Sequence, residues 1–122
     1  MAKIRLAING FGRIGRAALK IALEHDDVEV VAINDLGKPD FAAYLFKYDT
    51  AYGTYEKEVK ATESAIIIDG KEIPMYAIKG LEDLPWGKHK VDVVLECTGA
   101  FTKAQDANKH LVSGAKAVVI SA

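Results

Sequence analysis

The residues with the clearest chemical meaning are three glycines near the amino terminus, Gly10, Gly12 and Gly15, which form the pattern GxGxxG. A short apolar run precedes them and a helical pattern follows, the setting in which this pattern binds the pyrophosphate of a dinucleotide. The first glycine makes a tight turn, the second leaves room for the pyrophosphate, and the third lets the helix pack close to the strand. We expect the backbone amides of Arg13 and Ile14 to point at the phosphates from the amino end of that helix.

One acid, Asp35, lies 20 residues beyond Gly15, at the predicted end of a second apolar strand. An acid at this place accepts hydrogen bonds from the hydroxyls of an adenosine ribose, and it repels a 2′-phosphate. The sequence therefore predicts a site for NAD rather than NADP. The alternative is a plain strand-to-helix turn with Asp35 as a solvated loop acid, but the coincidence of strand, glycines, helix and acid favours the dinucleotide site.

A second group of candidate residues follows two later apolar strands. Thr98, Gly99 and Phe101 come after a strand that ends at Leu95, and Ser121 comes after the last strand. Because the carboxyl ends of parallel strands open onto one crevice, we expect these residues to face the nicotinamide half of the ligand. Locally, Thr98 and Gly99 are also compatible with a turn that binds nothing.

The remaining reactive side chains are predicted to be structural. A single cysteine, Cys97, forms no internal disulfide, and it ends an apolar strand with no histidine nearby in sequence, so we expect packing rather than a nucleophile. His25, His89 and His110 are scattered without metal-ligand spacing, and each is expected at the surface. The large aromatic residues are expected to pack in the core or on the domain surface: Trp86, Tyr44, Tyr48, Tyr52 and Tyr55.

Apolar patterns predict the elements that position these residues. Lys3–Asn9 and Val28–Ile33 are typical of buried strands, and they flank a helix that runs from Arg13 to about His25. A second helix is expected over Asp40–Tyr48, after Pro39. The first helix should bury the apolar positions that recur at helical spacing: Ile14, Ala17, Ala18, Ile21 and Ala22.

The middle of the chain is predicted to form short antiparallel strands. They are predicted over Lys57–Thr62, Ala65–Ile68 and Lys71–Ile73. Asp69 and Gly70 are the residue pair that a type I′ hairpin turn favours. Pro74 lacks a backbone donor and is expected to end the third strand, after which Met75–Ile78 returns to the main sheet.

The last third of the sequence is predicted to form a strand, a helix and a second strand. Val91–Leu95 and Lys116–Ser121 are apolar runs on either side of a helix. Thr102 and Gln105 have the spacing of a capping box at the start of this helix, and Gly114 is expected to stop it. The helix should bury an apolar stripe made of Ala104, Ala107, Leu111 and Val112.

Alternating strands and helices predict an α/β fold: a Rossmann-type, mainly parallel sheet with helices on both faces and a small antiparallel insertion. The 122 residues, half of them hydrophobic, suffice for one domain over 1–122 and exclude a disordered chain. Sixteen basic and 17 acidic residues are interspersed, so the sequence has no cluster of basic residues of the kind that binds nucleic acid. No signal peptide, membrane span or metal-binding cluster is recognised, and a cytoplasmic location is expected.

Longer motifs closely resemble the glyceraldehyde-3-phosphate dehydrogenase family. The resemblance runs through the whole chain in the family's order, over Ile8–Arg16, Ala32–Asp35, Lys47–Thr50, Leu84–Trp86, Glu96–Gly99 and Val118–Ala122. It implies the cofactor half of an enzyme that oxidises glyceraldehyde 3-phosphate to 1,3-bisphosphoglycerate with NAD and phosphate. The implied NAD contacts are Asn9, Gly10, Gly12, Arg13, Ile14, Asp35, Lys79, Thr98, Gly99, Phe101 and Ser121.

Two positions bear on how closely the family pattern is followed. Lys79 stands where the family often has an arginine beside the adenine, and Leu36 fits the NAD-dependent branch. The family's nucleophilic cysteine lies in a Ser-Cys-Thr-Thr-Asn segment that this chain does not contain. We therefore expect an amino-terminal NAD-binding domain without catalytic residues of its own, which does not turn over alone and whose partners are the catalytic domain and the family's homotetramer.

Three alternatives stay open on the sequence. The parent enzyme could be the related erythrose-4-phosphate dehydrogenase, although Asn34-Asp35-Leu36 looks more like the glyceraldehyde-phosphate enzyme. The chain could instead be a sensor or scaffold that binds NAD without chemistry. Finally, this chain, which we expect to be a truncated form, a proteolytic piece or one part of a split enzyme, could bind NAD poorly without the partner domain and neighbouring subunit that cover its crevice.

Overall fold

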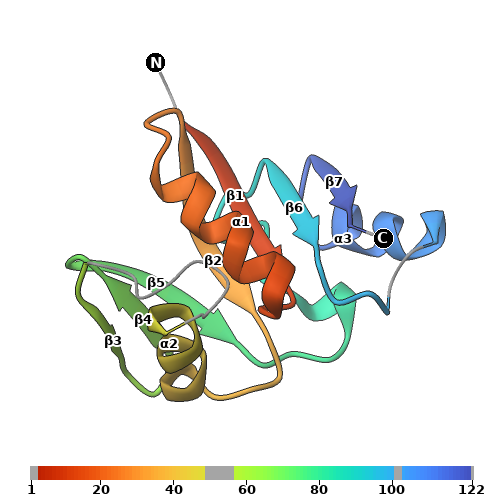
Figure 1. Ribbon diagram of the computed structural model, residues 1–122. Coiled ribbons are helices and arrows are strands. Elements are labelled where there is room, and N and C mark those ends of the chain that lie inside the picture. The colour runs from red at the N-terminus through yellow and green to blue at the C-terminus, as the bar shows by residue number, and fades with distance from the viewer. Residues whose placement is uncertain (1–2, 49–56, 101–102, 122) are drawn as a thin grey trace.

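The computed structural model describes residues 3–48, 57–100 and 103–121 (Figure 1). Its strands are β1 (Ile4–Asn9), β2 (Val28–Asn34), β3 (Val59–Ala61), β4 (Ala65–Ile68), β5 (Lys71–Tyr76), β6 (Val93–Glu96) and β7 (Ala117–Ile120). Its helices are α1 (Arg13–Leu23), α2 (Pro39–Lys47) and α3 (Ala104–Val112), with a single 3-10 turn, η1 (Leu81–Asp83). Most predicted strands differ from these bounds by two residues or fewer at either end.

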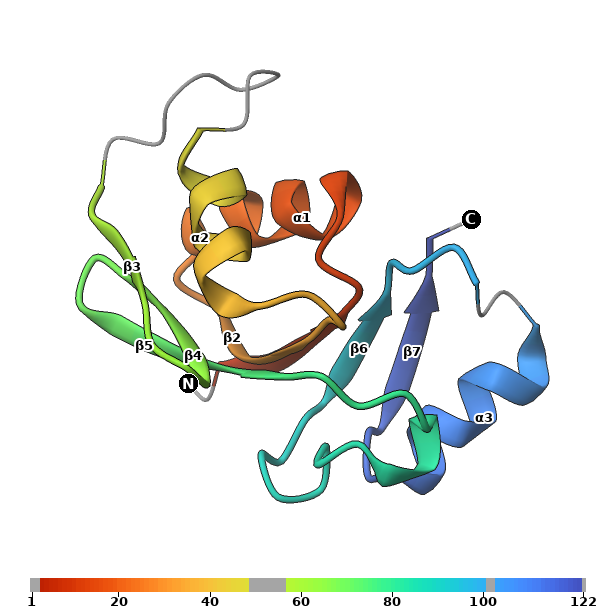
Figure 2. The same ribbon diagram turned by 90° about the horizontal axis from the view of Figure 1, so that it is seen from below.

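The described strands form one seven-stranded sheet in the order β3-β4-β5-β2-β1-β6-β7. Every neighbouring pair from β5 to β7 is parallel, whereas β3, β4 and the first part of β5 pair antiparallel. Helices α1 and α2 cover one face of the sheet, and α3 with η1 covers the other (Figures 1 and 2). The predicted α/β class, the helices on both faces and the antiparallel insertion are therefore confirmed.

The central strands bury both faces, which explains their continuous apolar sequence. In β1, Leu6 and Ile8 pack into the cluster under α1 and α2, whereas Ala7 packs into the cluster on the α3 side. The register between β1 and β2 shifts by one residue after Leu6, so that Val31 and Ala32 both lie in the second cluster. This irregularity locally interrupts the two-residue alternation of a strand.

The expectation that Pro74 ends its strand is wrong. β5 runs through Pro74 to Tyr76, and the pair Asp69-Gly70 before it has the two positive φ angles of the predicted turn, 51° and 82°. The backbone N–H of Met75 donates to the carbonyl of Ser64 on the β4 side. Because the backbone nitrogens of successive residues of a strand point to opposite sides, the nitrogen of Pro74, which carries no hydrogen, faces β2. Pairing with β2 begins only at Met75, and the proline therefore costs no ladder hydrogen bond.

Helix α1 is shorter than expected, and Ala22 is the one predicted apolar position of this helix that is buried. The helix ends at Leu23 rather than near His25, and its buried residues are Gly15, Leu19 and Ala22. The predicted core positions Ile14 and Ile21 are 54% and 58% exposed. The close approach of Gly15 to the sheet determines which face of α1 is buried. The prediction relied on the spacing of apolar side chains, and glycine has no side chain to contribute to that pattern.

Helix α3 also departs from its predicted pattern. Its N-cap is Lys103, whose backbone N–H lies 3.4 Å from the Asp106 carboxylate, so the predicted box starting at Thr102 is wrong by one residue; Thr102 itself lies outside the described residues. The stripe is also wrong, because Leu111 and Val112 are 42% and 68% exposed. The buried residue of this helix is His110.

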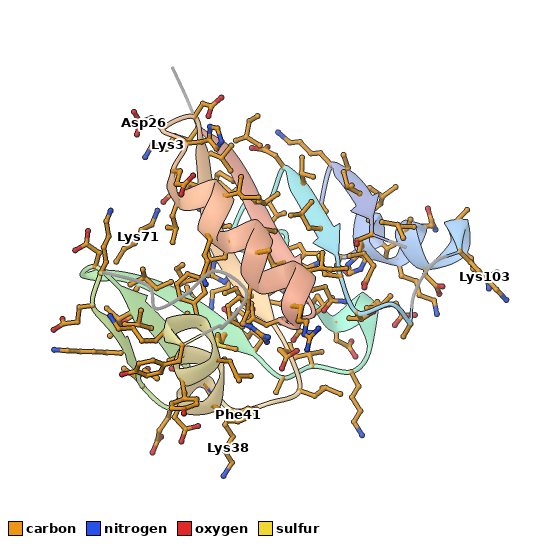
Figure 3. All side chains as sticks on the ribbon, viewed as in Figure 1. Lys3, Asp26, Lys38, Phe41, Lys71 and Lys103 are labelled. Atoms are coloured by element: carbon orange, nitrogen blue, oxygen red, sulfur yellow. The ribbon has the colours of Figure 1, made fainter. Side chains whose placement is uncertain are left out.

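Helix α2 carries aromatic side chains that the described residues leave uncovered. Phe41, Tyr44 and Tyr48 are each more than half exposed, and Phe41 lies at the outer end of the helix (Figure 3). The rings of Tyr44 and Tyr48 contact each other, with centroids 5.1 Å apart, which fits the predicted surface packing. Tyr52 and Tyr55 lie outside the described residues. None of the helices in the described ranges has the length and apolar character needed to cross a membrane.

Candidate functional site

The three glycines of the loop after β1 have different surroundings. Gly10 has φ +97°, and a Cβ there would lie 2.8 Å from the backbone nitrogen of Thr98. A Cβ on Gly15 would collide with the carbonyl oxygen of Gly10, whereas one on Gly12 would have no neighbour within 4 Å. The loop therefore has the predicted geometry: a tight turn, a close helix–strand contact, and between them an open backbone position that a ligand can approach.

Asp35 ties the end of β2 to this loop. One of its carboxylate oxygens accepts from the backbone N–H of Phe11 at 2.9 Å, and the other accepts from that of Gly37, also at 2.9 Å. Because each carboxylate oxygen has two acceptor positions, the group keeps capacity for further donors. The acid is half-buried and held in a fixed orientation beside the glycine loop.

A cavity of about 490 Å³ opens beside the carboxyl ends of β1, β2 and β6. Among the described residues, six of the predicted site residues line it: Asn9, Gly10, Gly12, Asp35, Lys79 and Thr98. The other lining residues are Asn34, Leu36, Ile78, Leu81, Cys97 and Ala100. Ligands of parallel sheets bind at this edge, where the connections diverge to opposite faces of the sheet.

Four other predicted contacts do not line the cavity. Arg13 and Ile14 are exposed at the start of α1, directly after Gly12. Gly99 is exposed between two lining residues, and Ser121, after β7, donates its backbone N–H to the carbonyl of Glu96 at 3.0 Å. Phe101 lies outside the described residues. The cofactor contacts of all these residues stay predictions.

Sequence reasoning predicted Asn9 but missed the two polar side chains bonded to it, Asn34 in the cavity wall and Glu96 behind it. Asn34 donates from Nδ2 to Asn9 at 2.8 Å and to the Ile78 carbonyl at 2.9 Å, and its own oxygen accepts from the Ile78 amide. Asn9 in turn donates to Glu96 at 2.6 Å. A detectable signal existed, because Asn9, Asn34 and Glu96 are each a polar residue at the carboxyl end of a mainly apolar strand.

The expectation that His110 lies at the surface is wrong. The side chain is fully buried, between the Trp86 indole at 3.0 Å and the Glu96 carboxylate at 2.8 Å. His89 is half-buried, with its ring nitrogen 2.6 Å from the Tyr76 hydroxyl, whereas His25 is exposed as predicted. These partners lie 13 to 24 positions away in the chain, so they leave no local pattern.

Comparison with known proteins gives the family. Residues 4–104 match the family model described as the NAD binding domain of glyceraldehyde 3-phosphate dehydrogenase. The chain belongs to the glyceraldehyde-3-phosphate dehydrogenase family. NAD is accordingly the cofactor of this domain, as the glycine loop and Asp35 predict.

Several relatives carry the family's name. The chain is 54% identical over 122 residues to glyceraldehyde-3-phosphate dehydrogenase of Clostridium acetobutylicum, covering 100% of this chain and 36% of the relative. It is 52% identical over 118 residues to that of Clostridium pasteurianum, with 97% and 35% covered. It is 51% identical over 119 residues to glyceraldehyde-3-phosphate dehydrogenase 1 of Candida glabrata, with 97% and 36% covered. The chain thus spans about a third of the length of these relatives.

Within this glyceraldehyde-3-phosphate dehydrogenase domain, Glu96 makes folding depend on pH. Burial raises the pKa of Glu96, but hydrogen bonds from His110, Thr98 and Asn9 together outweigh it, and the pKa lies below its ordinary value. The folded chain therefore takes up this proton less readily than the unfolded chain. The stabilisation is complete above the ordinary glutamate pKa of about 4.3, and it is lost as pH falls through the folded pKa.

Urea denaturation at a series of pH values tests this linkage. We expect the free energy of unfolding to fall more steeply below about pH 4.3 in the unmodified chain than in Glu96→Gln, because glutamine takes up no proton. The other acidic residues titrate in both proteins, so their contribution cancels when the two pH profiles are compared. Parallel profiles for the two chains would show that Glu96 contributes nothing to acid unfolding.

Cys97 lines the cavity but is poorly suited to attack a substrate. Burial raises the pKa of its thiol, and the neighbouring Glu96 carboxylate adds to the effect. Because the thiolate is the nucleophile, we expect alkylation of the folded chain by iodoacetamide at pH 7 to be slower than alkylation of the same chain unfolded in urea. A faster reaction in the folded chain would contradict the structural role of this cysteine.

Proposed function

We propose that this chain holds NAD in the cavity beside β1, β2 and β6, and that it supplies the cofactor half of a phosphorylating glyceraldehyde-3-phosphate dehydrogenase. The observation that carries the proposal is the pairing of an open Gly12 with an Asp35 carboxylate bonded to the same loop at Phe11. The residues present fit the ligand, because the loop offers an uncovered backbone beside a helix start and the acid offers free acceptor positions.

Each group of residues has a proposed task. Gly12, Arg13 and Ile14 bind the pyrophosphate through backbone amides at the amino end of α1, where the helix dipole also favours negative charge. Asp35 accepts from the adenosine ribose, and its negative charge disfavours a 2′-phosphate there. Lys79 lies beside the adenine, and its contact can be made by its backbone.

The far side of the site faces the reacting end of the cofactor. We place Asn9, Gly10, Thr98, Gly99, Phe101 and Ser121 toward that end. When bound, NAD would supply the hydride acceptor for oxidation of the aldehyde carbon. The task of this chain there is to hold the ring in place and exclude water. Cys97 is poorly suited to the covalent step, because burial raises the pKa of its thiol. We assign the covalent step on glyceraldehyde 3-phosphate to residues of the longer enzyme outside this chain.

Partners and location follow from the same assignment. The relatives named above are glyceraldehyde-3-phosphate dehydrogenases, which favours that activity over erythrose-4-phosphate oxidation. The catalytic domain and a homotetramer of the full-length protein are the proposed partners. Action in glycolysis in the cytoplasm is the corresponding biological role.

An assay of NADH formation tests the division of labour. The chain is incubated with NAD, phosphate and glyceraldehyde 3-phosphate, alone and together with the catalytic portion of the Clostridium acetobutylicum relative. We expect no NADH from the chain alone, and formation in the mixture only if the two portions associate. Turnover by the chain alone would contradict the assignment of the covalent step to residues outside it, and loss of that turnover in Cys97→Ser would identify Cys97 as the nucleophile.

A further inference from the structure

A buried polar chain behind the cavity is not explained by contacts to NAD. It runs from Trp86 through His110 to Glu96, with 3.0 Å between Trp86 Nε1 and His110 Nδ1 and 2.8 Å between His110 Nε2 and Glu96 Oε1. All three side chains are at most 1% exposed. Glu96 ends β6, so these three hydrogen-bonded side chains connect the α3 face of the sheet to the edge where the cavity lies.

The indole of Trp86 fixes the direction of both hydrogen bonds that join Trp86, His110 and Glu96. An indole nitrogen only donates, so His110 Nδ1 must accept. The ring proton of the neutral imidazole is then on Nε2, which donates to Glu96 Oε1. His110 thus presents a donor to the carboxylate.

The Glu96 carboxylate accepts four hydrogen bonds from the described residues, and three of them come from residues that line the cavity. Oε1 accepts from His110 and from Asn9 Nδ2, the latter at 2.6 Å. Oε2 accepts from the backbone N–H of Thr98 at 3.0 Å and from its hydroxyl at 2.6 Å. The Thr98 oxygen then accepts from the amide of Ala100 at 3.1 Å, so one carboxylate orders both Asn9 and the turn after β6.

The position of this turn matters for the shape of the cavity. Thr98 contacts the glycine loop so closely that a Cβ on Gly10 would lie 2.8 Å from both its backbone nitrogen and its Cγ2 atom. Releasing Thr98 from Glu96 would therefore move one wall of the cavity relative to the loop that meets the pyrophosphate. Replacing a buried charged group with a well-packed apolar side chain is often neutral or stabilising, so stability alone does not explain the charge.

We propose that Glu96 is a positioning residue for dinucleotide binding: held by His110 and Trp86, it fixes Asn9 and Thr98 in the arrangement that receives NAD. The inference rests on the proposed function and deepens it. Glu96 touches no ligand itself, since it does not line the cavity, and its effect on affinity passes through Thr98 and Asn9.

A double-mutant cycle measures this coupling. The NAD dissociation constant is determined by calorimetry for the unmodified chain, Glu96→Gln, Thr98→Val and the double variant, under conditions where circular dichroism shows each to be folded. Glutamine keeps the size of the side chain but replaces one acceptor with an NH2 donor, which opposes either the donors of Thr98 or those of Asn9 and His110. We expect Glu96→Gln to weaken NAD binding roughly tenfold, and the double variant to bind no more than about twofold more weakly than Glu96→Gln.

A matched control separates positioning from general loss of stability. Ile66 is fully buried in β4, near the opposite edge of the sheet from β6. Ile66→Val lowers the free energy of unfolding and should leave NAD affinity within about twofold. Glu96→Gln binding as tightly as the unmodified chain, or losses that add fully in the double variant, would overturn the inference. Absence of binding by the unmodified chain would instead overturn the proposed function before any variant is compared.

A second measurement needs no substitution, and it decides the matter if Glu96→Gln does not fold. Trp86 is the single tryptophan of the chain, so its indole N–H gives one identifiable ¹H–¹⁵N resonance. Because hydrogen bonds connect it through His110 and Glu96 to Thr98, we expect saturation with NAD to shift this resonance. An unchanged resonance in the NAD-saturated chain would overturn the inference.

Discussion

Gly15→Ala is expected to destabilise the domain by about 3 kcal/mol, the upper end of the range for an overpacked core. The added methyl group would collide with the carbonyl oxygen of Gly10, and backbone atoms on both sides prevent relaxation by rotamer change. NAD binding should be lost together with the fold of the loop. Urea denaturation measures the stability, and calorimetry measures NAD binding at a temperature where a folded fraction remains.

Gly12→Ala is the matched control for this prediction. A methyl group on Gly12 meets no atom within 4 Å, so the loss of stability should not exceed about 1 kcal/mol, the effect of a poorer helix cap. The same methyl group occupies the open side where the pyrophosphate approaches, and NAD affinity should fall by roughly tenfold or more. Equal effects of the two substitutions on stability would contradict the different roles given to the two glycines.

Asp35→Ala is expected to weaken NAD binding by roughly a hundredfold. Hydrogen bonds to a charged group contribute about 1.5–3 kcal/mol each, and the substitution removes the acceptors for the ribose hydroxyls. It also leaves the amides of Phe11 and Gly37 without their partner, so part of the loss comes from a loosened loop.

Asp35→Asn separates these two contributions. The amide side chain keeps one acceptor for the loop but has no negative charge. We therefore expect the preference for NAD over NADP to fall toward unity, with stability closer to that of the unmodified chain than Asp35→Ala shows. Calorimetric titration with both dinucleotides measures the ratio. An unchanged preference in Asp35→Asn would show that another residue selects the cofactor.

The glycine loop and its acid could be predicted because their signal is local. Gly10, Gly12 and Gly15 lie within six residues, and the apolar runs on either side define strands covered on both faces. The alternation of strands and helices then places Asp35 at the same sheet edge. The dinucleotide-binding turn and the placement of Asp35 beside it follow from spacing within the first 35 residues.

The polar chain behind the cavity could not be predicted, because its contacts join distant parts of the sequence. His110 lies 14 residues from Glu96 and 24 from Trp86, and the apolar pattern of α3 pointed instead to Leu111 and Val112. Periodicity weighs apolar side chains, and it cannot anticipate a histidine whose burial is compensated by two hydrogen bonds. Pro74 shows the same limit, because only the pairing on each side of β5 shows that its missing donor is harmless.

The central claim is that this chain alone forms an NAD site, and calorimetric titration of the folded chain with NAD tests it most directly. We predict saturable binding of one NAD per chain, with weaker binding of NADP in a parallel titration because of the charge on Asp35. A chain that is folded by circular dichroism yet releases no heat with NAD and leaves every NMR resonance unmoved would contradict the claim, and binding of both dinucleotides with equal affinity would contradict the role of Asp35.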